Sequence, residues 1–229
     1  MRTQMERVED VMEYPDDPAI TVDPTITKLE KLRGNIEINN LTFGYSRLEK
    51  PVIENFSMKL KTGDRVAIVG SSGSGKTTLT RLIGRLYPGQ QGAIYMGETE
   101  AESLSLRRWR DRFGLVSQNA VLFEGTVRDN ICYGVRDVRE EQLQSVIRLA
   151  CLEDVIASHE GGLRFNVGVN GEKLSGGERQ RLSTARAVLK NPSILFFDEA
   201  TASVDSLTEA KIQAAMEGVT AGRTSLMIA

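Results

Sequence analysis

The sequence is poor in the residues that bind metals or form disulfides. Its 229 residues include only two cysteines, Cys132 and Cys151, and one histidine, His159. This set has no metal-ligand spacing, which excludes a structural zinc site, and it indicates two reduced, partly buried thiols in a cytosolic protein. We expect His159 to be a surface residue of a helical region.

Long apolar runs and a strong net charge are also missing. No run approaches the ~18–20 residues that span a bilayer, and the start lacks the pattern of a signal peptide. The formal net charge is −2, so nothing overall favours nucleic acid or an anionic membrane surface, although a local basic face stays open. The 40% hydrophobic and 26% charged residues fit a soluble globular protein with one large domain or two small ones.

Residues 1–34 differ in pattern from the rest of the chain. Met5, Val8 and Met12 recur at helical spacing, which predicts one apolar stripe of a short helix. Pro15 and Pro18 then break this helix and begin a linker. An unstructured tail is the alternative for the same residues.

The hydrophobic periodicity of the remaining residues predicts an α/β fold. Residues 36–45 and 56–60 alternate with period two, as in half-buried antiparallel strands, and a turn follows at 61–64. Residues 66–69 are continuously apolar, which predicts a strand in the middle of a covered parallel sheet. Helices are predicted at 77–86, 142–152, 178–190 and 209–216, and further strands at 194–197 and from 225. We therefore expect a mostly parallel α/β core with an antiparallel β subdomain and an α-helical subdomain inserted at about 119–190.

The segment from Gly70 to Thr77 reads Gly-Ser-Ser-Gly-Ser-Gly-Lys-Thr and matches a P-loop. Its glycines let successive backbone N–H groups face phosphate groups, and the helix that follows directs its positive end to the same point. Lys76 is placed to reach the β- and γ-phosphates of a nucleotide, and Thr77 to ligate Mg²⁺. The motif follows an apolar strand and opens a helix, which is the context that it requires.

Two acidic residues end the apolar strand 194–197. Asp198 is placed to hold Mg²⁺ through water, and Glu199 to polarise the attacking water as general base. Helix capping is the alternative role for two such acids, and the presence of a P-loop in the same chain makes it the weaker one.

Residues 174–178 read Leu-Ser-Gly-Gly-Glu and precede a run of helix formers. Ser175 at an N-cap, followed by Gly176 and Gly177, describes a helix start with exposed amides, which is an anion site. Plain helix capping would explain the same residues. In this chain order, a second anion site cannot easily fold onto the first.

Together the three motifs resemble the nucleotide-binding domain of ATP-binding cassette (ABC) transporters, whose signature is this LSGGE or LSGGQ element. The resemblance covers residues 35–229 and implies a P-loop NTPase (RecA-like) core that binds and hydrolyses ATP with Mg²⁺. The segment from Leu122 to Ile131 is similar to ABC exporters, in which this region receives the coupling helices of a membrane domain.

The resemblance also implies roles for individual residues. It assigns catalysis to Glu199, Gln118 and Lys76, and Mg²⁺ binding to Thr77, Gln118 and Asp198. It makes Asp205 part of a loop that crosses a dimer interface. The implied ATP-binding residues are Tyr45, which stacks on adenine, and Gly70, Ser71, Ser72, Gly73, Ser74, Gly75, Lys76, Thr77, Thr78, Gln118, Ser175, Gly176, Gly177 and Glu178.

The implied active form is a head-to-tail dimer of two copies, each signature element closing on the ATP held by the other copy. The implied partners are ATP, a second copy and a transmembrane domain joined through residues 1–34, on the cytoplasmic side of the cell membrane; no nucleic acid is expected. Two alternatives stay open: a soluble ABC ATPase that acts on nucleic acid or ribosomes, and a non-catalytic nucleotide-binding module.

Two departures from the family pattern qualify these expectations. Residues 166–171 lack the glutamates that exporters usually carry before the signature, which bears on cross-talk between subunits. The family also places a switch histidine where the residue after Ala229 would lie, and His159 cannot replace it. We therefore expect a C-terminally truncated domain that binds ATP but turns it over weakly.

Overall fold

The structure, a computed structural model, describes residues 35–46, 48–71, 73–89, 91–117, 120–198 and 206–228, with no side-chain description for 206–212. The predicted connector at 1–34 lies outside these residues. In the described parts of the chain, no helix is long and apolar enough to cross a membrane.

The first sheet is antiparallel, as predicted, with the strand order β2-β1-β4-β5. Its strands are β1 (Ile36–Phe43), β2 (Ile53–Leu60), β4 (Gln91–Met96) and β5 (Thr99–Glu100). The pairing of β1 with β2 shifts register between Ile38 and Leu41, and Asn40 there has a φ of 50°. This bulge explains the change of phase in the sequence pattern, because it lets Ile36, Ile38, Leu41 and Phe43 all be buried.

The second sheet is entirely parallel, with the order β3-β8-β7-β6. Its strands are β3 (Arg65–Ile68), β6 (Phe113–Val116), β7 (Ile194–Asp198) and β8 (Thr224–Ile228). The prediction that residues 66–69 lie in the middle of a covered sheet is wrong for the described residues. There β3 pairs only with β8, its residues are half-buried or exposed, and Val69 is 74% exposed.

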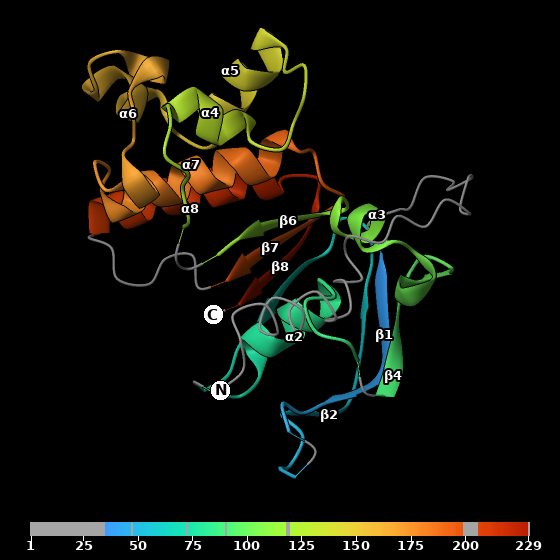
Figure 1. Cartoon of the computed structure of the whole chain (residues 1–229). Coiled ribbons are helices and arrows are strands. Elements are labelled where there is room, and N and C mark those ends of the chain that lie inside the picture. The colour runs from blue at the N-terminus through green and yellow to red at the C-terminus, as the bar shows by residue number, and fades with distance from the viewer. Residues whose placement is uncertain are drawn as a thin grey trace, which may run out of the picture.

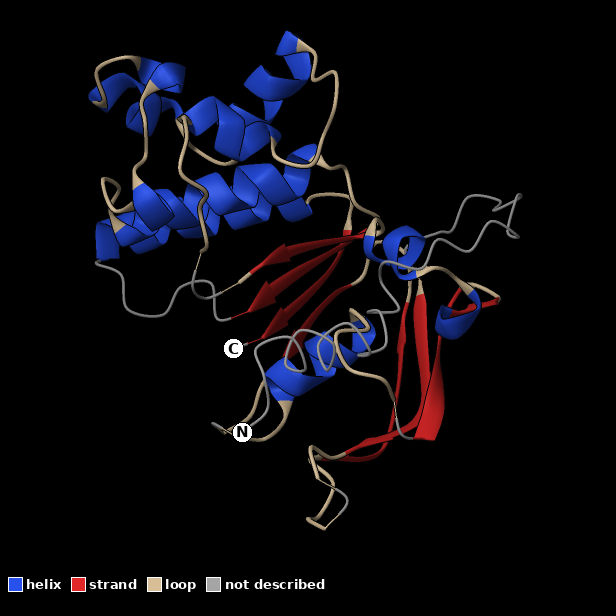
Figure 2. Ribbon diagram, in the orientation of Figure 1, coloured by secondary structure: helices blue, strands red, loops and turns tan. Residues whose placement is uncertain are grey.

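Helices cover both faces of the parallel sheet (Figures 1 and 2). One face packs on α2, the other on the helical lobe of α4 to α8. Strand β7 divides its side chains between them: Ile194 and Phe196 join the first core, Leu195 and Phe197 the second. The helices are α2 (Lys76–Ile83), α3 (Leu106–Arg110), α4 (Val127–Cys132), α5 (Glu140–Leu149), α6 (Glu153–Ser158), α7 (Gly176–Leu189) and α8 (Ser206–Thr220), with 3-10 turns η1 (Ala101–Ser103), η2 (Gly162–Arg164) and η3 (Val169–Gly171).

Several helix ends differ from the prediction. Helix α2 stops at Gly84, before Pro88, because Arg85 adopts a φ of 52° that no helix continues through. Leu86, predicted on its apolar face, is 54% exposed. Helix α7 begins two residues before the predicted start, and α8 extends the predicted 209–216 at both ends. The predictions for β7 and β8 are confirmed to within one residue.

The histidine and the cysteines are less exposed than surface residues. His159 is half-buried, and its ring lies 4.2 Å from that of Phe165, so the expected surface position is wrong. Both Cys132 and Cys151 are free and partly buried, as predicted.

Trp109 joins α3 to α2. Its side chain is fully buried, and its indole Nε1 donates a 2.7 Å hydrogen bond to the carbonyl of Ile83, at the end of α2. Its ring also packs on Phe113 at the start of β6. The side chain therefore fixes the end of α2 against the parallel sheet.

We expect Trp109→Phe to lower the free energy of unfolding by about 2–3 kcal/mol, because it opens a cavity and leaves the Ile83 carbonyl without its donor. Urea denaturation measures this change. Leu48→Ala is the control, because Leu48 is 97% exposed. Equal stability of the two variants would contradict the role of Trp109.

Candidate nucleotide-binding site

The loop between β3 and α2 has the backbone that phosphate binding requires. Gly73 and Gly75 have φ values of 82° and 91°. Gly75 is the N-cap of α2, and no side chain caps this helix. A Cβ atom at Gly70 would lie 2.8 Å from Ser74 Oγ. The first amides of α2 are thus left for an anion, and the glycines cannot carry side chains without strain.

Lys76 and Thr77 project from the first turn of α2 into this loop. The Lys76 ammonium donates to the carbonyl oxygens of Gly70 and Ser71, at 2.6 and 3.3 Å. The Thr77 hydroxyl donates to Asp198 Oδ1 at 3.3 Å. The structure therefore brings the predicted P-loop and the predicted acidic strand end together, because β3 and β7 both run toward this edge of the sheet.

The side chains at this edge fit a nucleotide with Mg²⁺. The Thr77 hydroxyl and one Asp198 carboxylate are two hard oxygen ligands, and Mg²⁺ takes the rest of its shell from water and phosphate oxygens. Among the described residues, no group of three His, Cys, Asp or Glu side chains could hold a metal ion by itself.

Tyr45 lies beside the P-loop helix. Its hydroxyl is 2.9 Å from Thr78 Oγ1, and its ring meets Phe43 and Tyr87 edge to face, at 5.2 and 5.5 Å. It remains 54% exposed. A ring held at its edge with a large exposed area offers a stacking surface for a flat base.

The signature segment is a capped helix start. Ser175 accepts from the Glu178 backbone N–H at 3.4 Å, and the Glu178 carboxylate accepts from the Ser175 N–H at 2.7 Å. Ser175 and Gly176 are exposed, whereas Gly177 is buried. Since the serine oxygen accepts in this capping box, its own proton stays available for an anion.

The structure leaves some predicted site residues undescribed. Ser72, Gln118, Glu199 and Asp205 lie outside the described residues, so their roles rest on the sequence. The capping role considered for Ser175 and Glu178 is present in the structure.

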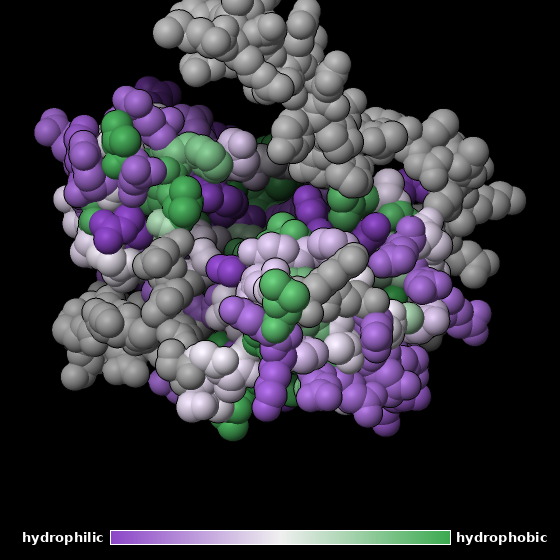
Figure 3. Space-filling view, turned by 60° about the horizontal axis from the view of Figure 1, so that its bottom comes forward, coloured by the Kyte–Doolittle hydropathy of each residue, from purple (hydrophilic) through white to green (hydrophobic). Residues whose placement is uncertain are grey.

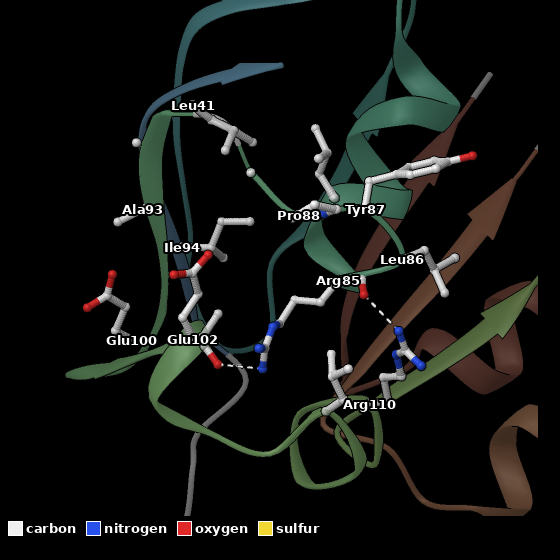
Figure 4. A pocket seen from close by; sticks show the side chains of 15 residues that line it. Leu41, Arg85, Leu86, Tyr87, Pro88, Ala93, Ile94, Glu100, Glu102 and Arg110 are labelled. Atoms are coloured by element: carbon white, nitrogen blue, oxygen red, sulfur yellow. Dashed lines mark hydrogen bonds between the residues drawn. The ribbon is translucent and has the colours of Figure 1, made fainter. Parts of the chain in front are cut away.

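A cavity of about 430 Å³ lies at the other end of α2 and is not the nucleotide site. Figure 4 shows its walls, in which Arg85 donates to the carbonyl of Ala101, and Arg110 to that of Arg85. Arg85 also donates to the carbonyl of Leu104, and Arg110 to that of Gly84. Burial lowers the pKa of Arg85. These arginines tie the end of α2 to η1 and α3, so the cavity belongs to the frame behind the P-loop.

Sequence reasoning missed an exposed aromatic pair beside the helical lobe. Phe123 and Tyr133 stack with ring centroids 4.1 Å apart, and they are 44% and 56% exposed. The signal was present, because Phe123 lies in the segment already compared with exporters. Tyr133 follows α4, and only the fold shows that the two rings meet. Elsewhere, on the face in Figure 3, exposed hydrophobic residues are scattered among polar ones.

The glycine loop, the lysine and the threonine–aspartate pair at the start of α2 define a P-loop nucleotide-binding domain. The sequence profile of the family described as "ABC transporter" matches residues 53–202. The chain therefore belongs to the ABC transporter family, and it corresponds to a nucleotide-binding domain of the exporter type.

Individual relatives agree with this assignment. The chain is 39% identical over 203 residues to human ATP-binding cassette sub-family B member 5, covering 88% of this chain and 16% of that protein. It is 41% identical over 203 residues to an ATP-dependent lipid A-core flippase of Francisella tularensis, covering 88% and 33%. A solved bacterial Atm1-family ABC exporter with ATP bound superposes with a TM-score of 0.87 and 35% identity, covering 98% of this chain and 39% of that chain. The chain thus spans between about a sixth and two fifths of these proteins.

We expect Gly75→Ala to weaken ATP binding about tenfold. An alanine at this position would be strained by its positive φ, and its Cβ atom would lie 3.1 Å from Val52 Cγ1. Gly63→Ala is the matched control. Gly63 has a similar φ of 89°, but nothing lies within 4 Å of its Cβ position. Titration with a fluorescent ATP analogue measures both; equal affinities would contradict the role of the Gly75 backbone.

Proposed function

We propose that this chain is the ATP-binding and ATP-hydrolysing motor domain of an ABC exporter. The observation that carries the proposal is the meeting of Thr77 with Asp198 beside the uncapped start of α2. It places a phosphate cradle and a pair of hard oxygen ligands at one edge of the parallel sheet. The similarity to exporters, one of them solved with ATP bound, supports the same function.

The residues divide the chemistry among themselves. The P-loop amides and Lys76 bind the phosphates, and Tyr45 stacks on the base. Thr77, Asp198 and Gln118 would hold Mg²⁺, which neutralises charge on the phosphates when it is bound. Glu199 takes a proton from the attacking water, with Gln118 beside it, and the hydroxide that forms attacks the γ-phosphorus in line. The bond from the γ-phosphorus to the bridging oxygen breaks, and ADP leaves with that oxygen.

A dimer is proposed because the two anion sites of one chain lie on opposite faces of the parallel sheet. Helix α2 follows β3, whereas α7 precedes β7 through the short connection 190–193, so α7 runs opposite to the strands. Both helix starts therefore point to the carboxyl side of the sheet, and the sheet separates them. A two-fold axis on that side lets the Ser175 segment of each copy face the P-loop of the other.

The second proposed partner is a transmembrane domain. Its docking site is the exposed pair Phe123 and Tyr133 with Val121, which is 59% exposed. The loop 121–126 connects directly to the signature. Val167 donates to the Gly125 carbonyl at 2.9 Å, and Lys173 donates to the Val167 carbonyl at 3.2 Å. These bonds give a docked segment a short route to Ser175, and the domain would then lie on the cytoplasmic side of the membrane.

We expect Lys76→Ala to weaken ATP binding at least about tenfold, since charge-assisted hydrogen bonds to phosphate contribute about 1.5–3 kcal/mol. Lys59→Ala is the control, because Lys59 pairs with Glu37 on the other sheet at 2.9 Å. Calorimetric titration with ATP measures both variants. An unchanged affinity of Lys76→Ala would remove the lysine from the site.

We expect Glu199→Gln to keep ATP binding and to accumulate an ATP-bound dimer, because the amide cannot accept the proton of the attacking water. Size-exclusion chromatography with ATP and Mg²⁺ measures the dimer. Adding Ser175→Ala to this variant should return it to monomer. A Glu199→Gln protein that stays monomeric at high concentration would argue against the dimer.

A further inference from the structure

A single arginine of the signature helix lies under the exposed aromatic pair. The guanidinium carbon of Arg186, in the last turn of α7, is 5.2 Å from the ring centroid of Phe123 and 5.8 Å from that of Tyr133. Arg186 is half-buried, so its guanidinium has lost part of its hydration, and this burial lowers its pKa. A cation with little water interacts more strongly with an aromatic face.

All three nitrogen atoms of this guanidinium also donate a hydrogen bond. Nε donates to the Asn130 carbonyl at 2.9 Å, and the two terminal nitrogens donate to the Val121 carbonyl at 2.8 Å and to Asn130 Oδ1 at 2.7 Å. Arg186 therefore joins the loop that carries Phe123 to the helix that leads to Tyr133.

Asn130 completes the connection. It is 1% exposed, accepts from the Phe123 N–H at 2.9 Å, and donates to the carbonyls of Phe123 and Thr126 at 2.8 and 3.1 Å. The position of Phe123 is thus determined by Asn130, and that of Asn130 by Arg186. A displacement of the aromatic pair must move the end of α7 or break several partly buried hydrogen bonds.

Helix α7 extends this connection to the signature. It is one uninterrupted helix from Gly176 to Leu189, so Arg186 and Ser175 are joined by about 16 Å of rigid helix. Its middle is buried against α4, α5 and the parallel sheet. A helix held in this way moves as a unit.

We propose that Arg186 is the positioning residue that couples the aromatic docking pair to the signature Ser175. The inference rests on the proposed function, because it requires a partner on Phe123 and Tyr133 and an ATP on Ser175. Movement of the docked partner is passed through the guanidinium to α7, and through α7 to the contact with the ATP of the other copy.

A lysine cannot replace the guanidinium in this role. It provides one compact donor group, whereas Arg186 spreads three donor directions in one plane that also lies against two rings. Arg186→Lys keeps the charge and most of the packing, so it separates coupling from folding. Arg223→Lys is the matched control, because Arg223 is also partly buried and bonds to the carbonyl of Val219 and to Asn191, with no aromatic ring over it among the described residues.

The experiment compares the chain alone with the transporter that contains it, reconstituted in lipid nanodiscs. We expect Arg186→Lys to leave the basal ATPase and the ATP affinity of the chain alone within about twofold of wild type. In the assembled transporter, the stimulation of ATPase by the membrane domain should fall at least about fivefold, the lower end of typical coupling effects. Arg223→Lys should change neither.

The outcomes are distinct. Stimulation that survives in Arg186→Lys overturns the inference, and so does an equal loss in the chain alone, which would show a merely structural role. If Arg186→Lys fails to fold, Phe123→Leu keeps an apolar contact but removes one ring, and it should reduce the stimulation by itself. A wild-type domain that the membrane domain does not stimulate contradicts the proposed function instead.

Discussion

The burial of the parallel sheet on both faces is the constraint on which the rest of the structure depends. Strand β7 shows it most directly: Leu195 and Phe197 are buried under the helical lobe, and Ile194 and Phe196 under the other core. A strand that is apolar on both sides cannot leave either face to water, so α2 and α7 must lie on opposite faces. The directions of the two helices then follow from the chain order, because α2 comes directly after strand β3 and α7 comes directly before strand β7.

The chemistry is concentrated where this constraint leaves backbone groups unpaired. The strands β3 and β7 both end at the carboxyl edge of the sheet, and the amides at the start of α2 have no side-chain cap. The Thr77 hydroxyl reaches Asp198 across 121 residues of sequence. Binding in a crevice at the carboxyl ends of strands is general for open α/β sheets, and here Gly73 and Gly75 adopt positive φ values that other residues would adopt only with strain.

The sequence predicted those parts of the fold and site that depend on local chemistry. The P-loop, the end of β7 and the capped start of α7 each follow from a few adjacent residues. The strands β4 and β6 and the helix α3 were not predicted, because they are short and their periodicity is weak. The end of α2 was predicted at residue 86 rather than at Ile83, because a positive φ at Arg85 has no sequence signal. The prediction that β3 lies in the middle of a covered sheet was wrong for a related reason. An apolar run does not show whether a strand has neighbours on one side or on both.

The aromatic pair illustrates the remaining limit. Phe123 and Tyr133 are ten residues apart, and neither residue alone indicates a shared surface. The two rings meet because the buried Asn130 side chain accepts a hydrogen bond from the Phe123 N–H and donates one to the Phe123 carbonyl. These two bonds fold the loop onto α4. Three hydrogen bonds and two ring contacts then offset the desolvation of the partly buried Arg186 guanidinium. Such a cluster cannot shift one member without disturbing the others, so a surface that appears as two loose aromatics in the sequence is, in the folded chain, a rigid extension of the helix that begins at the signature.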